Sequence, residues 1–407
     1  MDSEDRSSVS RGRLLILDDG DPRFPSGGQS TFVRRIVPVL PWGIHLGIPT
    51  RIRVPDNVGV VGGRRVGITR IAGSGDPSRR PMIPLRLRCA IGGILHLYRA
   101  LQQCDVVYVQ SIELLIPALL LGRRPVVFHI HGAANPLAVS RYRWARTRVP
   151  VALFTALYRM LVGRADRVLS VDQAGADMYD AIVGERGNST VVPICFDPAV
   201  FRPGRRREAR RSLGLSETSR VSVFVGRLEA SKGTSLLVRA VADANKHCGE
   251  STLLVVGDGS QRRAMEAEAA SLGVRVVFAG WLAQEELPMY LNAADVLLLP
   301  SEAEGMPTVV VESLACGTPV IAKSVGGLPD LIAQWSTGAL LPGDDLGDWS
   351  RAICQAFETE WSTDHLVQSV ERYTVESVCT QLDAVLIPLV GATVSTDRPS
   401  ERGGRLR

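Results

Sequence analysis

The sequence predicts an α/β protein with two doubly wound parallel-sheet domains. Short runs of leucine and β-branched residues recur along the 407 residues, each followed by a helical stretch. The runs are almost continuously apolar, which is typical of strands buried on both faces of a parallel sheet. The alternation occurs in two series separated by a segment rich in Pro, Gly and Arg. Two series of this kind indicate two doubly wound domains.

The predicted elements follow in order. The first series has strands at residues 13–19, 105–111, 125–132, 167–172 and 190–194. Between the first two, segment 48–84 is rich in Gly, Pro and Arg and predicts short strands and loops. The second series has strands at 221–227, 251–259, 274–280, 295–301 and 318–324. The stretch SQRRAMEAEAASLG at 260–273 carries charge on one side and apolar residues on the other, which predicts an amphipathic helix.

Two prolines, a glycine and an arginine run place the predicted linker near residues 200–205. We therefore expect an N-terminal domain at 13–203 and a C-terminal domain at 204–390, whose last helix can pack back on the first domain. Residues 1–12 are expected to be flexible, and the polar tail 391–407 to be disordered.

Composition excludes several classes. Seven scattered cysteines without a CxxC pair indicate neither a disulfide framework nor a zinc site, and they fit a reducing cytosol. The N-terminus does not read as a signal peptide, and the longest apolar segment, from Val149, is interrupted by Arg159. We expect a cytoplasmic protein, either free or peripheral at the inner face of the cell membrane.

Charge is divided unevenly along the chain. Residues 1–203 contain 27 Arg and no Lys against 16 acidic residues, a net charge of +11, whereas the second half is acidic. A basic half indicates an anionic partner, although solvated surface arginines explain it equally well. Segment 140–148, SRYRWARTR, interleaves Arg with aromatic residues but forms no single basic stripe on a helix. It suggests peripheral contact with an anionic membrane, and we expect no nucleic-acid partner.

Glu304 and Glu312 stand eight positions apart in EGMPTVVVESLACG. On one continuous helix that spacing is about 12 Å, which exceeds the separation of glycosidase carboxylate pairs. The segment instead reads as a strand, a Gly/Pro loop and a helix N-terminus, a geometry that binds phosphate through free N–H groups near Thr308 and Val309. Carboxylates on either side suit a ligand with hydroxyls at both ends. The alternative is two ordinary solvent-exposed acids.

These residues carry a family resemblance. Segment 304–332 resembles the E-x7-E region of retaining glycosyltransferases of the GT-B fold, family 4, and FVGRLEASKG at 224–233 is similar to the family's "GRL…KG" segment. The resemblance implies two Rossmann-like domains facing across a cleft and a hexosyltransferase that uses a nucleotide-sugar donor. The acceptor could be a glycan, a lipid-linked compound or a small molecule, as in polysaccharide or glycoconjugate biosynthesis. It also implies that no metal or other cofactor is needed.

The resemblance implies roles for particular residues. Arg227 and Lys232 would neutralise the leaving diphosphate, Glu304 would hold the sugar hydroxyls and Glu312 the ribose. His131, at the end of a strand, would meet the donor sugar as a fourth catalytic residue, and the implied reaction needs no enzyme nucleophile. The other expected donor contacts are Gly27, Gly28, Gly226, Gly257, Gly305, Met306, Thr308 and Val309.

Several readings stay open or are set aside. Gly257-x-Gly259 lacks the third glycine of a dinucleotide fingerprint, so these glycines could serve only the turn. Asp19-Gly20-Asp21 spells a DxD motif, but we reject metal binding there and leave Asp19 an acceptor-side role. The usual PNGVD reads PICFD at 193–197, and Pro307 replaces a frequent glycine, which puts donor-sugar specificity in doubt. Alternatives are an epimerase or phosphorylase of the same fold, and a non-catalytic binding protein.

Overall fold

The computed structural model describes residues 11–25, 27–50, 57–73, 85–131, 147–184 and 186–391. Contacts between residues divide the chain into two compact units. Unit 1 is Met1–Ser170, Gly175–Val191 and Cys379–Arg407, and unit 2 is Val171–Ala174 and Val192–Val378. The chain passes from unit 1 into unit 2 after Val191, which lies before the linker expected near residues 200–205. The domain boundary expected at residue 203 stays a prediction.

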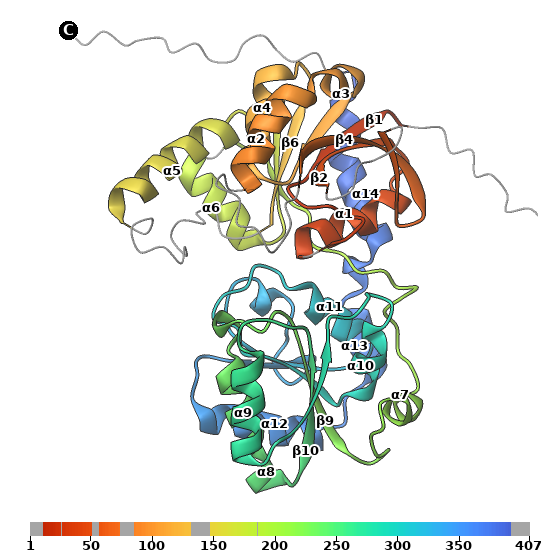
Figure 1. The fold of residues 1–407 in the computed structure, drawn as a ribbon, viewed down its shortest axis with the longest axis vertical. Helices are drawn as coiled ribbons and strands as arrows, with labels where there is room; N and C mark the ends of the chain where they lie inside the picture. The colour runs from red at the N-terminus through yellow and green to blue at the C-terminus, as the bar shows by residue number, and fades with distance from the viewer. Residues whose placement is uncertain are drawn as a thin grey trace, which may run out of the picture. The chain divides into compact units, whose positions relative to one another are not determined.

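Unit 1 is an α/β unit built on one eight-stranded sheet (Figure 1). Its strands are β1 (Arg13–Leu17), β2 (Gly43–Thr50), β3 (Val58–Val61), β4 (Arg64–Gly73), β5 (Val106–Val109), β6 (Val126–Ile130), β7 (Arg167–Ser170) and β8 (Ser189–Val191). Its helices are α1 (Gly28–Val39), α2 (Leu85–His96), α3 (Tyr98–Gln103), α4 (Ile112–Leu121), α5 (Arg148–Val162) and α6 (Gln173–Val183), and it shares α14 (Val375–Leu386) with unit 2.

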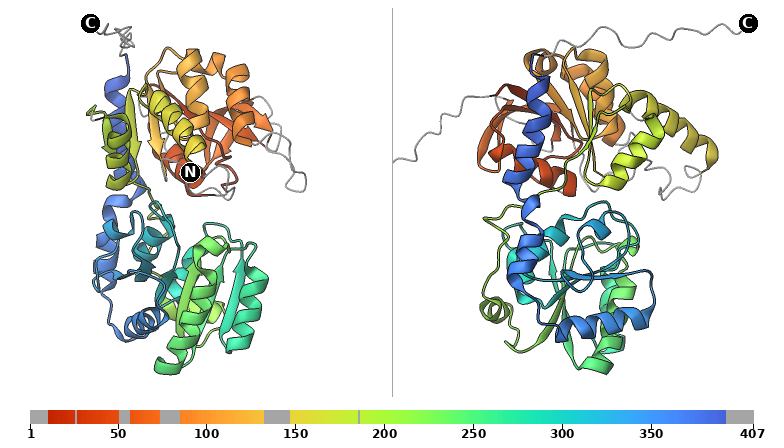
Figure 2. Two further views of the ribbon diagram at one scale, coloured as in Figure 1. Left: turned by 90° about the vertical axis from the view of Figure 1, so that its left-hand side faces the viewer. Right: turned by 180° about the vertical axis from the view of Figure 1, so that it is seen from behind.

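The strand order in this sheet is β3-β4-β2-β1-β5-β6-β7-β8, and only the β3–β4 pair is antiparallel. Helices α2 to α5 cover one face, where they share a buried apolar cluster with β1, β5 and β6 (Figure 2). The end of α14 is anchored to unit 1, because the Trp42 indole donates to Asp383 Oδ1 over 2.6 Å.

Unit 2 contains a six-stranded sheet that is parallel throughout, in the order β11-β10-β9-β12-β13-β14. Its strands are β9 (Arg220–Val225), β10 (Ser251–Val256), β11 (Arg275–Gly280), β12 (Val296–Leu299), β13 (Val320–Lys323) and β14 (Gly338–Leu341). Its helices are α7 (Arg206–Ser212), α8 (Thr234–Cys248), α9 (Arg262–Leu272), α10 (Leu287–Ala293), α11 (Thr308–Ala315), α12 (Leu346–Glu358) and α13 (Thr363–Ser369).

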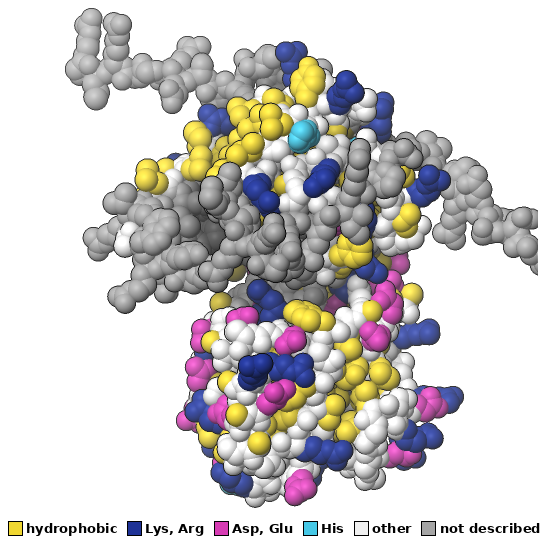
Figure 3. Space-filling model, in the orientation of Figure 1, with side chains coloured by type: hydrophobic (Ala, Val, Ile, Leu, Met, Phe, Trp, Pro, Cys, Tyr) yellow, Lys and Arg dark blue, Asp and Glu magenta, His cyan; other side chains and the backbone are white. Residues whose placement is uncertain are grey.

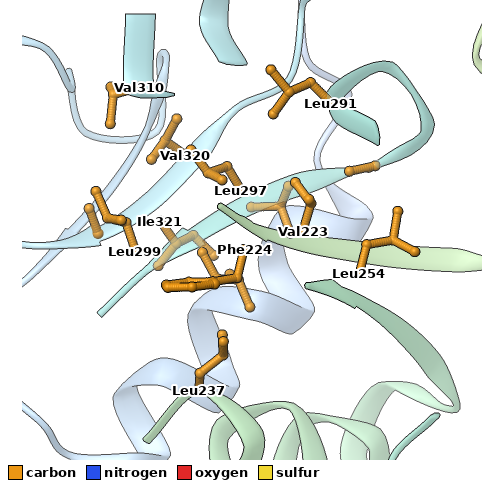
Figure 4. Packing of buried hydrophobic residues seen from close by; sticks show 14 of the residues in the cluster. Val223, Phe224, Leu237, Leu254, Leu291, Leu297, Leu299, Val310, Val320 and Ile321 are labelled. Atoms are coloured by element: carbon orange, nitrogen blue, oxygen red, sulfur yellow. The ribbon is translucent and has the colours of Figure 1, made fainter. Parts of the chain in front are cut away.

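The core of unit 2 lies on both faces of this sheet. Phe224 on β9 and Leu237 on α8 pack on one face, and Val310 of α11 and Leu291 of α10 lie toward the other (Figure 4). All four side chains are buried. Burial on both faces is the reason that these strands read as continuous apolar runs rather than alternating patterns.

The fold class is confirmed, and all ten predicted strands are present. Strands β3 and β4 fall within the segment expected to hold short strands, whereas β2 and β14 were not predicted. Strand β2, GIHLGIPT, contains glycine and proline, which weaken a strand pattern. It accommodates Pro49 at a register shift in its pairing with β4. The predicted helix at 260–273 corresponds to α9.

Some predictions fall on parts of the chain that the structure does not describe. These are the N-terminal segment up to residue 10, most of the aromatic and basic segment 140–148, and the tail from residue 392. Among the described helices, none is both long enough and apolar enough to cross a bilayer. The cytoplasmic location stays a prediction.

Candidate functional site

The sheet of unit 2 has a topological switch point between β9 and β12. From β9 the chain builds outward through β10 and β11, and then returns to place β12 on the other side of β9. In parallel sheets, ligands bind outside the carboxyl ends of the strands at such a point. Arg227 and Lys232 follow β9, and Glu304 and the start of α11 follow β12. The structure therefore brings four of the predicted features to one end of two neighbouring strands.

Lys232 and Glu304 form an ion pair, with 2.6 Å between Nζ and Oε1. Both side chains are largely buried, at 21% and 11% exposure. The sequence predicts instead that the two residues bind different parts of a ligand. A lysine ammonium has three donors, so a second and third N–H remain to meet phosphate oxygens. Arg227 is exposed, and within the described residues it has no ion-pair partner.

Backbone contacts hold the two loops in place. Glu302 N–H donates to Ser231 O over 2.9 Å, which joins the Lys232 loop to the Glu304 loop. Gly327 N–H donates to Gly305 O over 2.8 Å. A Cβ on Gly326 would lie 1.8 Å from Glu304 O, and the residue has a φ of +55°. Only glycine fits that position, so the pair Gly326-Gly327 is a positioning element for Glu304 to which sequence reasoning assigned no role.

Helix α11 begins at Thr308, directly after Pro307, as the sequence predicted. Pro307 supplies no side-chain cap, so the first amides, including those of Thr308 and Val309, remain available as donors. Glu312 lies one turn further along and is buried. The side chain of Met306 belongs to the apolar core, so any ligand contact from that residue would come from its backbone.

Gly226 and Gly257 have a clear packing function. Gly257 has a φ of +124°, and a Cβ there would lie 2.0 Å from Gly226 O. A Cβ on Gly259 would lie 2.4 Å from Leu228 O. The glycines therefore let the turn after β10 lie against the turn after β9, which carries Arg227. Their contact with a donor stays a prediction.

Unit 1 has its own switch point, between β1 and β5. Gly27 and Gly28 follow β1 at the start of α1, and a Cβ on either one would meet no atom of the described residues within 4 Å. Neither residue has the positive φ that favours glycine. Neither packing nor backbone conformation explains this pair, which leaves room for the close ligand approach that the sequence suggested.

His129 and His131 lie on the same side of β6, as their alternation predicted. Their ring centroids are 4.1 Å apart, and the edge of Phe32 packs against both. His129 is wholly buried and bonds the Tyr108 hydroxyl, which indicates a packing role. His131 Nε2 is buried without a hydrogen-bond partner in the described structure. Burial lowers the pKa of His131 to about 3, so its imidazole is neutral at physiological pH.

Three further residues at this edge were missed by sequence reasoning. Asp18 is fully buried and accepts hydrogen bonds from the Gly20 amide and the Gln29 side chain. Burial, with help from the charge of Asp19, raises its pKa to about 7. After β5, both amide atoms of Gln110 and the Ser111 hydroxyl are buried without partners within the described residues. Polar residues directly after apolar strands were the available signal.

The described residues contain no group of three or more His, Cys, Asp or Glu side chains that could hold a metal ion. Asp21 of the DxD sequence is instead engaged by Arg23, with 2.7 Å between Oδ2 and Nη2. A Cβ on Gly20 between the two aspartates would lie 1.9 Å from the Ser30 hydroxyl. This loop is therefore a packed turn.

Comparison with known families assigns both halves of the chain. Residues 27–200 match the profile described as Glycosyltransferase Family 4, and residues 205–372 match Glycosyl transferases group 1. The chain belongs to glycosyltransferase family 4. The matched ranges include Gly27, Gly28, His131 and all the site residues named in unit 2, but not Asp18.

Among curated relatives, this family 4 chain is similar to two proteins named D-inositol 3-phosphate glycosyltransferase. The protein from Acidothermus cellulolyticus is 38% identical over 213 residues, which cover 48% of each chain. The protein from Mycolicibacterium smegmatis is 33% identical over 263 residues, covering 61% of this chain and 60% of the relative. The chain thus spans about half to three-fifths of the length of these relatives.

Solved structures of GT-B glycosyltransferases share the fold. Sucrose-phosphate synthase from Thermosynechococcus elongatus matches with a TM-score of 0.73 at 21% identity, over 93% of this chain and 98% of that one. Anabaena HepE in complex with UDP-glucose matches with a TM-score of 0.70 at 20% identity, over 92% and 99%. At these identities the likeness establishes the GT-B fold.

Proposed function

We propose that this protein transfers a sugar from a nucleotide-diphosphate sugar to a hydroxyl-bearing acceptor, with retention of configuration. The observation that carries the proposal is the switch point of unit 2. There, Arg227, Lys232 and the amides that begin α11 supply positive charge and hydrogen-bond donors beside two carboxylates. This combination suits a diphosphate held between a sugar and a ribose.

The cations would act on the leaving group. Negative charge accumulates on the departing phosphate as the glycosidic bond breaks, and fixed donors stabilise that charge. Arg227 can offer a fork of N–H groups and Lys232 a point charge. The bond to Glu304 limits the conformations of the Lys232 ammonium, so less side-chain entropy would be lost when phosphate binds. The departing phosphate would then accept the proton of the attacking hydroxyl on the same face of the sugar.

The carboxylates would orient the two rings. Glu304 would accept hydrogen bonds from sugar hydroxyls, since the bond to Lys232 uses one oxygen and leaves further acceptor sites on the carboxylate. Glu312, buried on α11, would accept from the ribose hydroxyls. Neither role requires proton transfer by the protein.

The nucleotide and sugar are best found by direct binding. We expect micromolar to submillimolar affinity for one of the UDP-, GDP- or ADP-sugars in a calorimetric panel, and UDP-glucose is a reasonable first probe because the similar HepE structure contains it. Lys232→Met should weaken binding about tenfold or more. Lys246→Met is the matched control, because Lys246 pairs with Asp243 on the exposed side of α8. Failure of every nucleotide sugar and free nucleoside diphosphate to bind at millimolar concentration would refute the proposal.

The acceptor would bind at the carboxyl ends of the strands in the unit 1 sheet. The Gln110, Ser111 and His131 atoms that have no hydrogen-bond partner among the described residues are neutral donors and acceptors, which suit hydroxyl groups. The relatives' printed name makes an inositol phosphate a candidate, beside a glycan or a lipid-linked acceptor. Incubation with donor and each acceptor class, followed by mass spectrometry, should give one glycosylated product. Donor conversion without any acceptor would instead indicate the epimerase alternative.

A further inference from the structure

We propose that unit 1 docks onto an anionic membrane surface through the outer sides of α2, α4 and α5, called here the α2–α5 face. The three helices are neighbours, with α4 in the middle. The inference rests on exposed apolar side chains and unpaired arginines in this unit. It does not depend on the proposed transfer reaction, and it concerns a surface distinct from segment 140–148.

Helix α2 has its large apolar residues on the outside. Leu87, Ile91 and Leu95 follow one another at intervals of four and are all exposed, Leu95 at 68%, and Tyr98 at the start of α3 is 58% exposed. Residues at this spacing share one face of a helix. The inner side is made of small residues instead. A Cβ on Gly92 would lie 1.5 Å from Ile71 O, and one on Gly93 would lie 2.7 Å from the Pro117 ring.

Helix α5 repeats the arrangement. Leu153, Leu157 and Met160 are exposed at helical spacing, and Leu153 reaches 67% exposure. On its inner side, Tyr158 and Val162 are buried in the apolar cluster of unit 1. Leu120, at the end of α4 between the other two helices, is 71% exposed. Three adjacent helices therefore expose apolar side chains on one side of unit 1, and clustered apolar exposure of this kind can mark an interaction surface.

Arginines border this face without acidic partners. Arg99, Arg123, Arg124 and Arg159 are exposed, and none has an ion pair within the described residues. Figure 3 shows hydrophobic side chains gathered over α2 and α4, with Lys and Arg side chains nearby. In unit 2, Arg206 and Arg262 pair with Asp295 and Glu266, although Arg227 and Arg263 are exposed there without an ion pair within the described residues.

The arginines that border the α2–α5 face indicate what binds to it. A self-complementary dimer through this face would bring together the arginines of two copies, which have no ion pairs within the part of the chain that the structure describes, and their like charges would repel. Anionic lipid headgroups would neutralise them, while the leucine stripes enter the boundary between headgroups and acyl chains. The combination of apolar helix faces and bordering arginines is that of a peripheral membrane surface.

The test is flotation of the full-length protein with vesicles of phosphatidylglycerol and phosphatidylcholine, or of phosphatidylcholine alone. We expect binding to the anionic vesicles that is weakened by salt. Leu95→Asp should reduce the partition coefficient about tenfold, because it removes an inserted side chain and adds a negative charge. Leu272→Asp is the matched control, since Leu272 is an exposed leucine on α9 of unit 2.

A second pair of variants tests the charges. Arg123→Glu with Arg124→Glu should reduce binding at least tenfold at low salt, whereas Arg263→Glu on α9 should not. Circular dichroism and donor binding confirm that each variant is folded. The proposal is overturned if wild-type protein ignores anionic vesicles, or if the unit 2 controls lose binding equally. It is also overturned if Leu95→Asp only converts a dimer into monomers in sedimentation equilibrium.

Discussion

The carboxyl ends of the two sheets differ in the polar groups that they carry, although the strand topology at their switch points is alike. In unit 2 the groups are charged, with Lys232 paired to Glu304 and Arg227 exposed beside them. In unit 1 several of them are neutral: burial lowers the pKa of His131 to about 3, and Gln110 and Ser111 have no hydrogen-bond partners within the described residues, although Asp18 and Asp19 follow β1 at the same edge. The same backbone arrangement can therefore prepare one edge for phosphates and the other for hydroxyls.

The glycines differ in the same way. Gly257 and Gly326 lie so close to neighbouring backbone that no side chain fits, whereas Gly27 and Gly28 face open space. Gly257 and Gly326 let the loops of the unit 2 site pack together before any ligand binds. No packing contact within the described residues of unit 1 accounts for Gly27 and Gly28. Four changes, taken from the largest expected effect to the smallest, test this contrast.

Replacing Arg227 should have the largest effect. Arg227→Ala removes a fixed donor from the proposed leaving group, and losing one such donor typically slows the chemical step by about 100- to 1,000-fold. We expect kcat to fall by that amount with only a modest change in donor affinity, measured by steady-state kinetics and calorimetry. Arg263→Ala is the control. Unchanged turnover would remove Arg227 from the mechanism.

Gly257→Ala should destabilise unit 2. The added methyl would collide with Gly226 O at a backbone position with positive φ, and such overpacking with backbone strain costs about 3 kcal/mol. Urea denaturation measures the loss. A stability loss below about 0.5 kcal/mol, the usual range for surface substitutions, would mean that the two turns can separate and that the glycine serves the ligand instead.

Asp18→Asn should alter the pH dependence of stability. The folded state keeps a proton on Asp18 up to about pH 7, whereas the carboxyl ordinarily has a pKa of 3.8. Stability from this group is therefore fully present below pH 4 and is lost as pH rises through 7. Asparagine stays neutral, so the variant should gain roughly 3 kcal/mol relative to wild type between pH 4.5 and pH 8.

Urea unfolding of both proteins at the two pH values checks this prediction. Asp19→Asn removes only the neighbouring charge. It should therefore give a smaller gain in stability between the two pH values, because burial is the larger cause of the raised pKa of Asp18. An Asp18→Asn difference that does not change with pH would show that the carboxyl is ionised in the folded protein.

Gly28→Ala should leave stability almost unchanged, within about 0.5 kcal/mol, because Gly28 opens α1 and its Cβ would meet nothing. If a ligand approaches this backbone, KM for the donor should nevertheless rise several-fold. Comparison with Gly257→Ala separates the two kinds of glycine directly. A large stability loss would mean that Gly28 packs against the protein after all.

Much of the fold follows from local sequence. Most of the ten strand predictions succeeded because a strand buried on two faces must be apolar throughout, as in Val296–Leu299. Strands β8 and β11 are only partly buried. Strand β14 was not predicted because its four residues, GALL, contain only two large apolar side chains and read as part of a loop. Strand β2 was not predicted because its glycines and Pro49 are typical of a turn. Only its pairing with β1 and β4 makes that segment a strand.

By itself, the sequence determined the α/β class, the two-sheet arrangement, the helix start at Thr308 and the family resemblance. Each of these depends on residues close together in the chain. Only the tertiary structure decided that Lys232 binds Glu304, that Gly326 packs on the Glu304 carbonyl, and that Asp18, Gln110 and His131 share one edge of unit 1. These contacts join segments distant in sequence, and the order in which parallel strands are laid beside one another creates them.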